Sequence, residues 1–438
     1  MKKISWAAGA ALCSVAAVAA PAHAANPDLL DTLKQKGILS DDEYRQLRDQ
    51  QQHDQATTPG ATFSADKGLT LATADGAYTL QFGIFQQLDF AAYDADGSDL
   101  ADGSQLRRSR IALGGKLGSD WQYRFQYEFA KGSASITDAY VTYAGFKPLT
   151  VKLGQAKLPF SMESLSSAST TTFMERGLPA YVISPILRAP GVQLSSTGRH
   201  WSLAGGVSGE PLGNSSSGDE GWGIAARATF APYVANHRVV HLGAGINWRK
   251  PTQDNSGTTP STSAVTFSGK PESGQAPSFV STKAMLDVGS YRLSNAEFAA
   301  ALGAASLQSE YLWINVQRDN GQDDLAFSSW YAQLAYTLTG EARPYSVSKG
   351  SFGAIVPNTP FGAQGWGAFE VAARMSQLDL DDGSVTGGNE RDLTFGLSWY
   401  LNRYLRVSAN VVKVLKVDGG SYDGQKPVAY QMRLQFSI

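Results

Sequence analysis

The chain has 438 residues, of which 42% are hydrophobic and 17% charged, and its formal net charge is −2 at pH 7. A mean hydropathy of −0.22 is too polar for a bundle of membrane-spanning helices, and after the first residues no apolar run reaches the roughly 18 residues that one such helix needs. The sequence has no run of basic residues that would indicate a nucleic-acid partner.

Residues 1–24 are predicted to be a secretory signal peptide. Lys2 and Lys3 precede the short apolar stretch 6–20, and Ala22-His23-Ala24 places small residues at the positions that a signal peptidase reads. The alternative is a membrane anchor, for which the apolar stretch is too short. Cleavage would remove Cys13, the only cysteine, so the mature chain would have no disulfide and no thiolate chemistry.

Residues 25–52 are predicted to be a small helical segment on the periplasmic side. A helix over 28–36 ends at Gly37, and Ser40 to Glu43 form a capping box that opens a second helix. These helices bury too little surface alone. We expect them to associate with their own copies, in a coiled-coil-like way, or with the rim of the β-barrel that residues 78–438 are predicted below to form. A frayed leader is the alternative. Residues 53–77 are interpreted as a linker.

From residue 78 to residue 438 the pattern is one of two-faced strands. It is clearest over 121–129, where Trp121, Tyr123, Phe125, Tyr127 and Phe129 share one face and Gln122, Arg124, Gln126 and Glu128 share the other. An aromatic face opposite a charged face is typical of strands with lipid on one side and water on the other. The same alternation closes the chain over 428–438.

The fold class predicted is therefore all-β: a transmembrane antiparallel β-barrel of about 16 strands in the bacterial outer membrane, with a short N-terminal helical segment. Sixteen strands leave an aqueous channel. A further candidate near 279–289 is assigned to a loop, because single-chain bacterial barrels carry an even number of strands. We place the strands near residues 78–90, 105–118, 121–129, 136–146, 149–157, 191–197, 200–209, 221–231, 238–249, 294–303, 305–318, 326–340, 364–379, 391–401, 403–416 and 428–438.

Several segments carry a resemblance to a known family. They are Arg107-Arg108-Ser109-Arg110 with Gly114-Gly115, then Glu175-Arg176, the stretch from Tyr331 to Glu341, and Met432 to Gln435. With these motifs in this order, the chain resembles the phosphate-selective porin O/P family. The resemblance implies a trimer of sixteen-stranded barrels, each with its third external loop folded inward to narrow the pore.

The resemblance also implies an anion site at that narrowing. Arg107, Arg108 and Arg176 match the constriction arginines of the family. The family's lysine falls on Ser164, beside Glu163, and its aspartate falls on Thr137, with Asp138 adjacent. The arginine ladder that lines the outer vestibule in the family is absent, because residues 261–274 offer only Lys270, beside Glu272.

Strand phase assigns directions to the charged residues. It points Arg108, Arg110, Arg124 and Glu128 into the lumen and Arg107 toward lipid, where a charge near the midplane costs roughly 2–4 kcal/mol. A β-bulge or a strand start at Arg107 would let both neighbouring arginines reach water, and the resemblance favours that geometry. Guanidinium groups suit oxyanions because their planar forks bind bidentately and stay charged.

Other assignments of these charges remain open. The arginines could pair with acidic loop residues such as Asp102, or Glu163 and Glu175 could dominate the loop and favour cations. Enzyme activity is not expected, because there is no Gly-x-Ser-x-Gly elbow and no His/Cys/Glu spacing for a metal. No catalytic residue, metal or cofactor is therefore assigned.

The sequence predicts a homotrimeric porin, surrounded by outer-membrane lipid, through which small hydrophilic solutes diffuse passively. Anions such as phosphate or polyphosphate are the expected solutes. A general or weakly cation-selective porin without a phosphate site, and a structural or adhesive barrel, are the alternatives.

Overall fold

The computed structural model describes residues 28–57, 60–64, 68–97, 99–212, 219–254, 261–262, 264–362 and 365–438. The predicted signal peptide lies outside these residues. The chain forms two compact units, one ending at Thr58 and one beginning at Pro59. None of the described helices combines the length and the hydrophobicity that crossing a membrane requires.

The first unit contains the two predicted helices, α1 (Asp28–Gln35) and α2 (Asp41–Thr57). The capping box at the start of α2 is confirmed. The backbone N–H of Ser40 donates to Glu43 Oε2 at 2.9 Å, and the backbone N–H of Glu43 donates to Ser40 Oγ at 3.3 Å. These two bonds satisfy amide groups that the first helical turn leaves without a partner.

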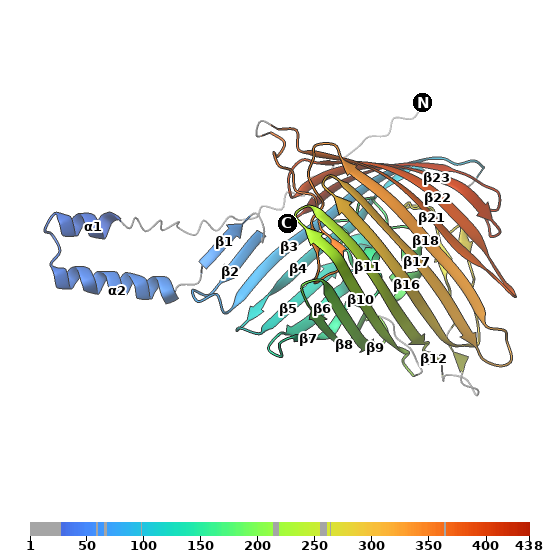
Figure 1. Cartoon of the computed structure of the whole chain (residues 1–438), viewed down its shortest axis with the longest axis horizontal. Helices are drawn as coiled ribbons and strands as arrows, with labels where there is room; N and C mark the ends of the chain where they lie inside the picture. The colour runs from blue at the N-terminus through green and yellow to red at the C-terminus, as the bar shows by residue number, and fades with distance from the viewer. Residues whose placement is uncertain are drawn as a thin grey trace, which may run out of the picture. The chain divides into compact units, whose positions relative to one another are not determined.

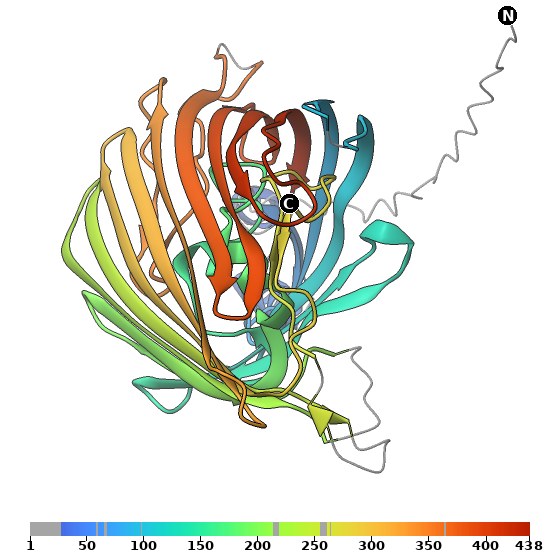
Figure 2. The ribbon, with the colours of Figure 1, turned by 90° about the vertical axis from the view of Figure 1, so that its right-hand side faces the viewer.

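The second unit is a closed antiparallel barrel of sixteen strands, as predicted (Figures 1 and 2). Each strand pairs with its neighbour in the chain, and the last strand pairs with the first. Backbone hydrogen bonds of 2.9 and 3.1 Å between Ile438 and Ile84 complete the closure. The barrel strands are β3 (Thr79–Asp94), β4 (Gly103–Leu117), β5 (Trp121–Glu128), β6 (Ser135–Tyr143), β7 (Leu149–Lys157), β8 (Arg188–Thr197), β9 (Trp201–Ser208), β10 (Trp222–Ala235), β11 (Arg238–Lys250), β16 (Val288–Leu302), β17 (Ala305–Arg318), β18 (Leu325–Thr337), β21 (Ala368–Asp382), β22 (Val385–Tyr400), β23 (Leu405–Asp418) and β24 (Val428–Ser437).

The segment interpreted as a linker is more ordered than expected. It holds the end of α2 and a hairpin of β1 (Gly60–Ser64) and β2 (Gly68–Ala72). Strand β2 pairs with residues 79–82 of β3, whereas β24 pairs with residues 85–94. The hairpin therefore supplies hydrogen-bond partners to the part of β3 that the closing strand does not reach, which an exposed strand edge would otherwise lack.

The two faces of the strands divide as predicted. On β5, Trp121, Phe125 and Tyr127 are 43%, 43% and 42% exposed, whereas Gln126 is buried. On β24, Tyr430, Met432 and Leu434 are exposed, whereas Gln431, Arg433 and Gln435 are buried. The apolar residues therefore cover the outer wall, and the polar residues point into the barrel.

Three long connections carry short elements of their own. Residues 158–187, the inward loop, contain α3 (Met162–Leu165), α4 (Pro179–Ile183) and η2 (Ser184–Ile186). Residues 251–287 contain β12 (Gln253–Asp254), β13 (Ser261–Thr262), β14 (Ser268–Gly269) and β15 (Val280–Ser281), so the candidate strand near 279–289 belongs mainly to a loop. Residues 338–367, the inward turn, contain β19 (Tyr345–Ser346) and β20 (Ser351–Phe352), and the short η1 (Ala130–Gly132) follows β5.

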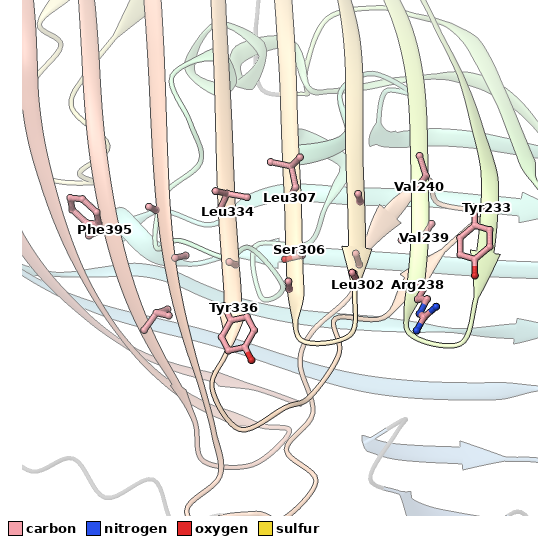
Figure 3. Close-up of a pocket in the computed structure, with 17 residues that line it drawn as sticks. Tyr233, Arg238, Val239, Val240, Leu302, Ser306, Leu307, Leu334, Tyr336 and Phe395 are labelled. Atoms are coloured by element: carbon pink, nitrogen blue, oxygen red, sulfur yellow. The ribbon is translucent and has the colours of Figure 1, made fainter.

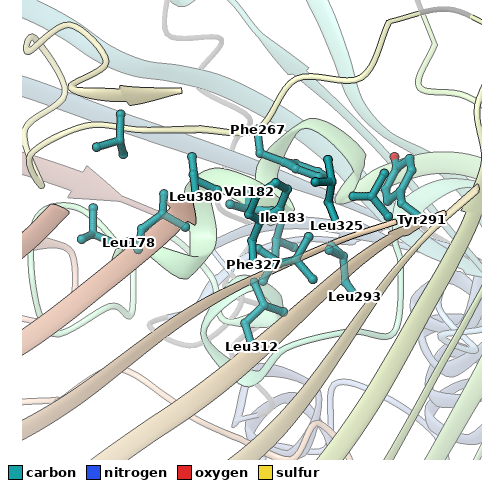
Figure 4. Packing of buried hydrophobic residues seen from close by; sticks show 14 of the residues in the cluster. Leu178, Val182, Ile183, Phe267, Tyr291, Leu293, Leu312, Leu325, Phe327 and Leu380 are labelled. Atoms are coloured by element: carbon teal, nitrogen blue, oxygen red, sulfur yellow. The ribbon is translucent and has the colours of Figure 1, made fainter. Parts of the chain in front are cut away.

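Part of the barrel interior is apolar, although the strand pattern predicts water on the inner side of the wall. Val182 and Ile183 of α4 and Phe267 of the loop pack against buried side chains of β16, β17 and β18, among them Leu312 and Phe327 (Figure 4). Removing these side chains from water stabilises the inward loop by roughly 25 cal/mol per Å² of apolar surface. The inward loop is therefore held in a fixed place inside the barrel.

Candidate functional site

The polar side of the barrel interior encloses a cavity of about 780 Å³, which we call the lumen cavity. The inward loop and the inward turn both contribute to its wall. Among the described residues, nine cationic side chains and one acidic side chain line it. The cations are Arg108, Arg110, Arg124, Lys152, Lys157, Arg176, Arg188, Arg227 and Lys349, and the acidic side chain is Asp138.

A β-bulge separates the two neighbouring arginines on β4, as strand phase requires if both are to avoid lipid. Gln87 of β3 pairs with Arg108, and the next residue, Leu88, pairs with Leu106, so Arg107 is the extra residue. Arg108 lines the lumen cavity and donates to Gln87 Oε1 at 2.6 Å. Arg107 does not line the cavity. Its Nε and Nη2 donate to the Glu175 carboxylate at 2.8 Å each.

A second bulge lies at Thr137, where the pairing of β5 with β6 shifts by one residue. Thr137 Oγ1 donates to the carbonyl oxygen of Gln126 at 3.0 Å, and Asp138 faces the lumen cavity. The Asp138 carboxylate is 2.9 Å from Arg188 Nε and 3.4 Å from Arg124 Nε. One negative charge is thus shared by two guanidinium groups, and a positive charge remains.

Glu128 lies on the inner face, opposite Arg110 in the ladder, as strand phase predicts, but it does not line the lumen cavity itself. Its carboxylate pairs with Arg110 Nε at 2.7 Å and accepts hydrogen bonds from the backbone N–H groups of Ser109 and Ala130, at 2.7 and 3.1 Å. These bonds turn the carboxylate toward the backbone of the strand ends. Arg110 itself lines the cavity.

Two cations hold the inward loop through its backbone. The three N–H groups of the Lys157 ammonium donate to the carbonyl oxygens of Ser164, Leu165 and Ser166, at 2.6, 3.0 and 2.8 Å. Arg176 donates from Nε to the carbonyl of Glu163 and from Nη2 to that of Ser166, at 2.9 and 2.8 Å. Both cations line the lumen cavity, and neither forms a salt bridge with a carboxylate of the described chain.

Ser164 does not take the place of the family's lysine in the pore. It is 1% exposed, it does not line the cavity, and its backbone N–H donates to Ser161 Oγ at 3.2 Å. The side chain lies inside the fold of the inward loop because α3 turns it away from the lumen. The ammonium charge nearest this position comes from Lys157.

The acidic residues of the inward loop act as anchors. Glu175 is bound by Arg107 and also by Arg433 at 2.7 Å, and Arg433 in turn pairs with Asp89 at 2.6 Å. Burial would raise the pKa of the Glu175 carboxyl, but the guanidinium groups of Arg107, Arg433 and Arg108 outweigh it and hold that pKa well below the ordinary range.

Glu163 is also buried, and it contacts Arg374 at 3.4 Å and the backbone N–H of Gly177 at 3.1 Å. Burial raises the pKa of its carboxyl, and the nearby arginines Arg374 and Arg176 only partly offset this. Neither Glu163 nor Glu175 lines the lumen cavity. The alternative in which these two residues govern the pore therefore lacks the geometry that it needs.

Glu272 and Lys270, the charged residues considered for the outer vestibule, also form hydrogen bonds within the protein. Glu272 accepts hydrogen bonds from Arg374 Nε at 2.9 Å and Ser376 Oγ at 2.6 Å. Lys270 donates to the carbonyls of Gly274 and Ala276, at 2.8 and 3.1 Å. Asp102, the other acidic candidate, accepts a bond from the backbone N–H of Tyr93 at 2.8 Å, and Arg107 pairs with Glu175 instead.

Sequence reasoning missed five of the cavity cations: Lys152, Lys157, Arg188, Arg227 and Lys349. Lys157 is the last residue of β7 and Arg188 the first of β8, so their places at the two ends of the inward loop were a usable signal. Lys349 offered none, because its position depends on how the inward turn folds. That turn is bound by Arg227, which donates to the carbonyls of Lys349 and Gly350 at 2.9 and 2.7 Å.

Comparisons with known proteins agree with this architecture. The family model of phosphate-selective porin O and P matches residues 77–438. Porin O of Pseudomonas aeruginosa is 28% identical over 418 residues, which are 87% of this chain and 93% of that protein.

Among solved structures, the fold is similar to an anion-selective porin from Comamonas acidovorans, with a TM-score of 0.56 and 12% identity over 82% of this chain and all of that one. It is also similar to a loop-deletion mutant of OmpT, an outer membrane protein of Vibrio cholerae, with a TM-score of 0.53 and 11% identity over 83% of this chain and all of that one. The match to the family model spans the whole barrel. The chain therefore belongs to the phosphate-selective porin O and P family, and it is a porin of the bacterial outer membrane rather than an enzyme.

Proposed function

We propose that this porin conducts anions in preference to cations and that the lumen cavity is its selective region. The observation that supports the proposal is the charge of the lining. Among the described residues, nine cationic side chains line the cavity against one acidic side chain, Asp138, and only two of the nine, Arg110 and Arg227, pair with carboxylates outside the lining, those of Glu128 and Glu297. In a narrow passage with protein walls, the fields of such charges add and act more strongly than in bulk water. A ring of cationic side chains favours anions.

The solutes that fit this lining best are oxyanions of the phosphate class. Arg108 and Arg176 line the cavity without a carboxylate partner in the described chain, and guanidinium groups bind oxyanions through charge-assisted, often bidentate hydrogen bonds. Ser166, Ser167 and Thr170 also line this wall, where the hydroxyl groups of Ser166 and Thr170 donate to the backbone carbonyls of Met162 and Ser167. The family's description as phosphate-selective points to the same class.

We further propose that the working form is a homotrimer in the outer membrane, reached after the signal peptide has been removed. A trimer form has been solved for OmpT of Vibrio cholerae, which shares the fold. The export signal, the helical segment and the barrel together fit this route.

The test is the reversal potential of the purified protein in a planar bilayer under a potassium chloride gradient, with inorganic phosphate added as a blocker. We expect a reversal potential close to the equilibrium potential of chloride. We also expect weak block by phosphate, because Ser164 contributes no charge to the cavity. A reversal potential on the potassium side would contradict the proposal. Chloride preference with no block at any phosphate concentration would instead support a general anion porin.

A further inference from the structure

The outer wall of the barrel carries an apolar groove of about 860 Å³ near the ends of β10, β11, β16, β17, β18, β21 and β22 (Figure 3). We propose that this groove binds one glycerophospholipid of the periplasmic leaflet, with the phosphodiester held at Arg238. This site lies on the opposite face of the wall from the lumen cavity and does not depend on what the pore conducts.

The groove follows a row of outward residues that pair across six strands. The row runs Val240, Ala300, Leu307, Leu334, Ala373 and Phe395, each directly opposite the next in the antiparallel ladder. Five strand spacings of about 4.8 Å make the row roughly 24 Å long. Strands of such barrels tilt by roughly 35–45°, so a row perpendicular to them rises obliquely through about 15 Å of membrane. That is about half of the hydrocarbon core, the depth of one leaflet.

The depth of the groove comes from small residues between large ones. Ala300, Ala305 and Ala373 line it, whereas Leu302, Leu334 and Tyr336 stand out from the wall with 64%, 61% and 52% exposure. Acyl chains laid along the alanines would contact methyl groups below and larger side chains at the sides. Such contacts supply the dispersion energy that distinguishes a groove from a flat wall.

The polar end of the groove marks where a headgroup would sit. Arg238 is the first residue of β11, and Figure 3 shows its guanidinium beside the turn, with the Tyr233 ring on the neighbouring strand end. Within the described chain, the Arg238 side chain has no hydrogen-bond or ion-pair partner. Short turns of bacterial barrels face the periplasm, and aromatic and cationic side chains at that level meet lipid headgroups. A phosphodiester complements the unpaired guanidinium at the end of an otherwise apolar groove.

The experiment uses the full-length protein in mild detergent, freed of lipid and then mixed with phosphatidylglycerol, phosphatidylethanolamine or neutral diacylglycerol. Native mass spectrometry counts the lipids that remain on each protein assembly. We expect one strongly retained phospholipid per barrel with either phospholipid, and much weaker retention of diacylglycerol. Arg238→Gln should lower phospholipid retention roughly tenfold, equivalent to about 1.4 kcal/mol, and leave diacylglycerol retention unchanged.

A pair of tryptophan variants tests the groove itself. Ala300→Trp fills its floor and should abolish phospholipid retention, whereas Ala296→Trp places the same side chain on the same face of β16, outside the groove, and should not. Heat-modifiable gel mobility reports that each barrel is folded. Equal retention in both tryptophan variants and in Arg238→Gln would overturn the proposal. So would dissociation of the assembly by Ala300→Trp without loss of lipid, because the groove would then be an interface between copies.

Discussion

Arg107 and Arg108 are neighbours in sequence, yet the bulge on β4 directs them to different partners. Arg107 anchors the inward loop through Glu175, and Arg108 faces the lumen cavity. A similar bulge at Thr137 directs Asp138 toward Arg124 and Arg188. At the scale of single residues, one extra residue in a strand decides which charges a solute meets.

Arg108→Ala and Arg176→Ala should each shift the reversal potential toward cation preference. Each change removes a positive charge that no carboxylate of the described chain neutralises. The shift should grow at low salt, because screening acts over about 10 Å at 0.1 M and over longer distances in more dilute solution. The matched control is Arg238→Gln, which removes an arginine from the outer wall. If the control shifted the potential as far as the two lumen variants, the assignment of selectivity to the cavity would be wrong.

Asp138→Asn should have the opposite effect. The amide is nearly the same size as the carboxylate, and its introduction frees Arg124 and Arg188 from their shared negative charge. Anion preference in the chloride gradient should therefore increase, and phosphate should block at lower concentration. Asp102→Asn, which changes an exposed acid outside the cavity, is the control and should have little effect.

At the scale of elements, three kinds of contact hold the inward loop, and each kind acts on a different part of it. Val182 and Ile183 pack in the apolar part of the interior, Lys157 and Arg176 bind its carbonyls, and Glu175 is clamped by two arginines. Apolar packing, cationic hydrogen bonds and ion pairs thus act on different parts of one segment. This division lets the loop present Arg176 to the lumen while its own carboxylates stay buried.

Glu175→Gln should loosen that anchor. It removes the charge partner of the partly buried Arg107 and one of the two carboxylates that bind the buried Arg433, and breaking a buried ion pair from one side costs about 3–5 kcal/mol. We expect a lower Tm and noisier single-channel currents. In the wild type the lowered pKa of Glu175 means that its stabilising charge is present above the ordinary value of 4.5 and is lost only when the pH falls through the still lower folded value. The wild-type currents should therefore stay steady between pH 7 and pH 5. Single-channel currents that become noisier over that interval would contradict the role of Glu175 as an anchor of the inward loop.

Ser164→Lys should disturb the inward loop instead of strengthening phosphate block. The buried position of Ser164, whose carbonyl binds Lys157, would force a second ammonium into the fold of the loop. We expect lower thermal stability and a wider, less selective pore, measured by single-channel conductance. Stronger phosphate block with unchanged stability would show that the new lysine reaches the lumen.

At the scale of the whole molecule, the barrel and the N-terminal helices are separate compact units. The helices are short, and isolated helices of this length are marginally stable in water. We therefore expect them to be ordered by association with other copies in a trimer. The barrel has its own closed hydrogen-bond ladder, so we expect it to fold without them.

Deleting residues 28–57 should leave a folded barrel whose trimer dissociates at lower temperature. Gel mobility of unheated and heated samples distinguishes the folded trimer, the folded monomer and the unfolded chain. A deletion variant with unchanged trimer stability, together with amide exchange showing unprotected helices in the intact protein, would contradict this role.

The amino-acid sequence by itself determined the barrel, its sixteen strands and the division of their faces. These features follow from local alternation, because lipid and water on opposite sides of a strand impose a period of two on its side chains. It also indicated a bulge or a strand start at Arg107, since a charge in lipid is too costly, and the structure shows the bulge. Only the tertiary structure decided which charges meet the solute. Arg107 is bound by Glu175, Ser164 is buried, and Lys349 lies at the cavity next to Arg227. Each of these positions depends on contacts between segments that are far apart in the chain, and no local pattern encodes such contacts.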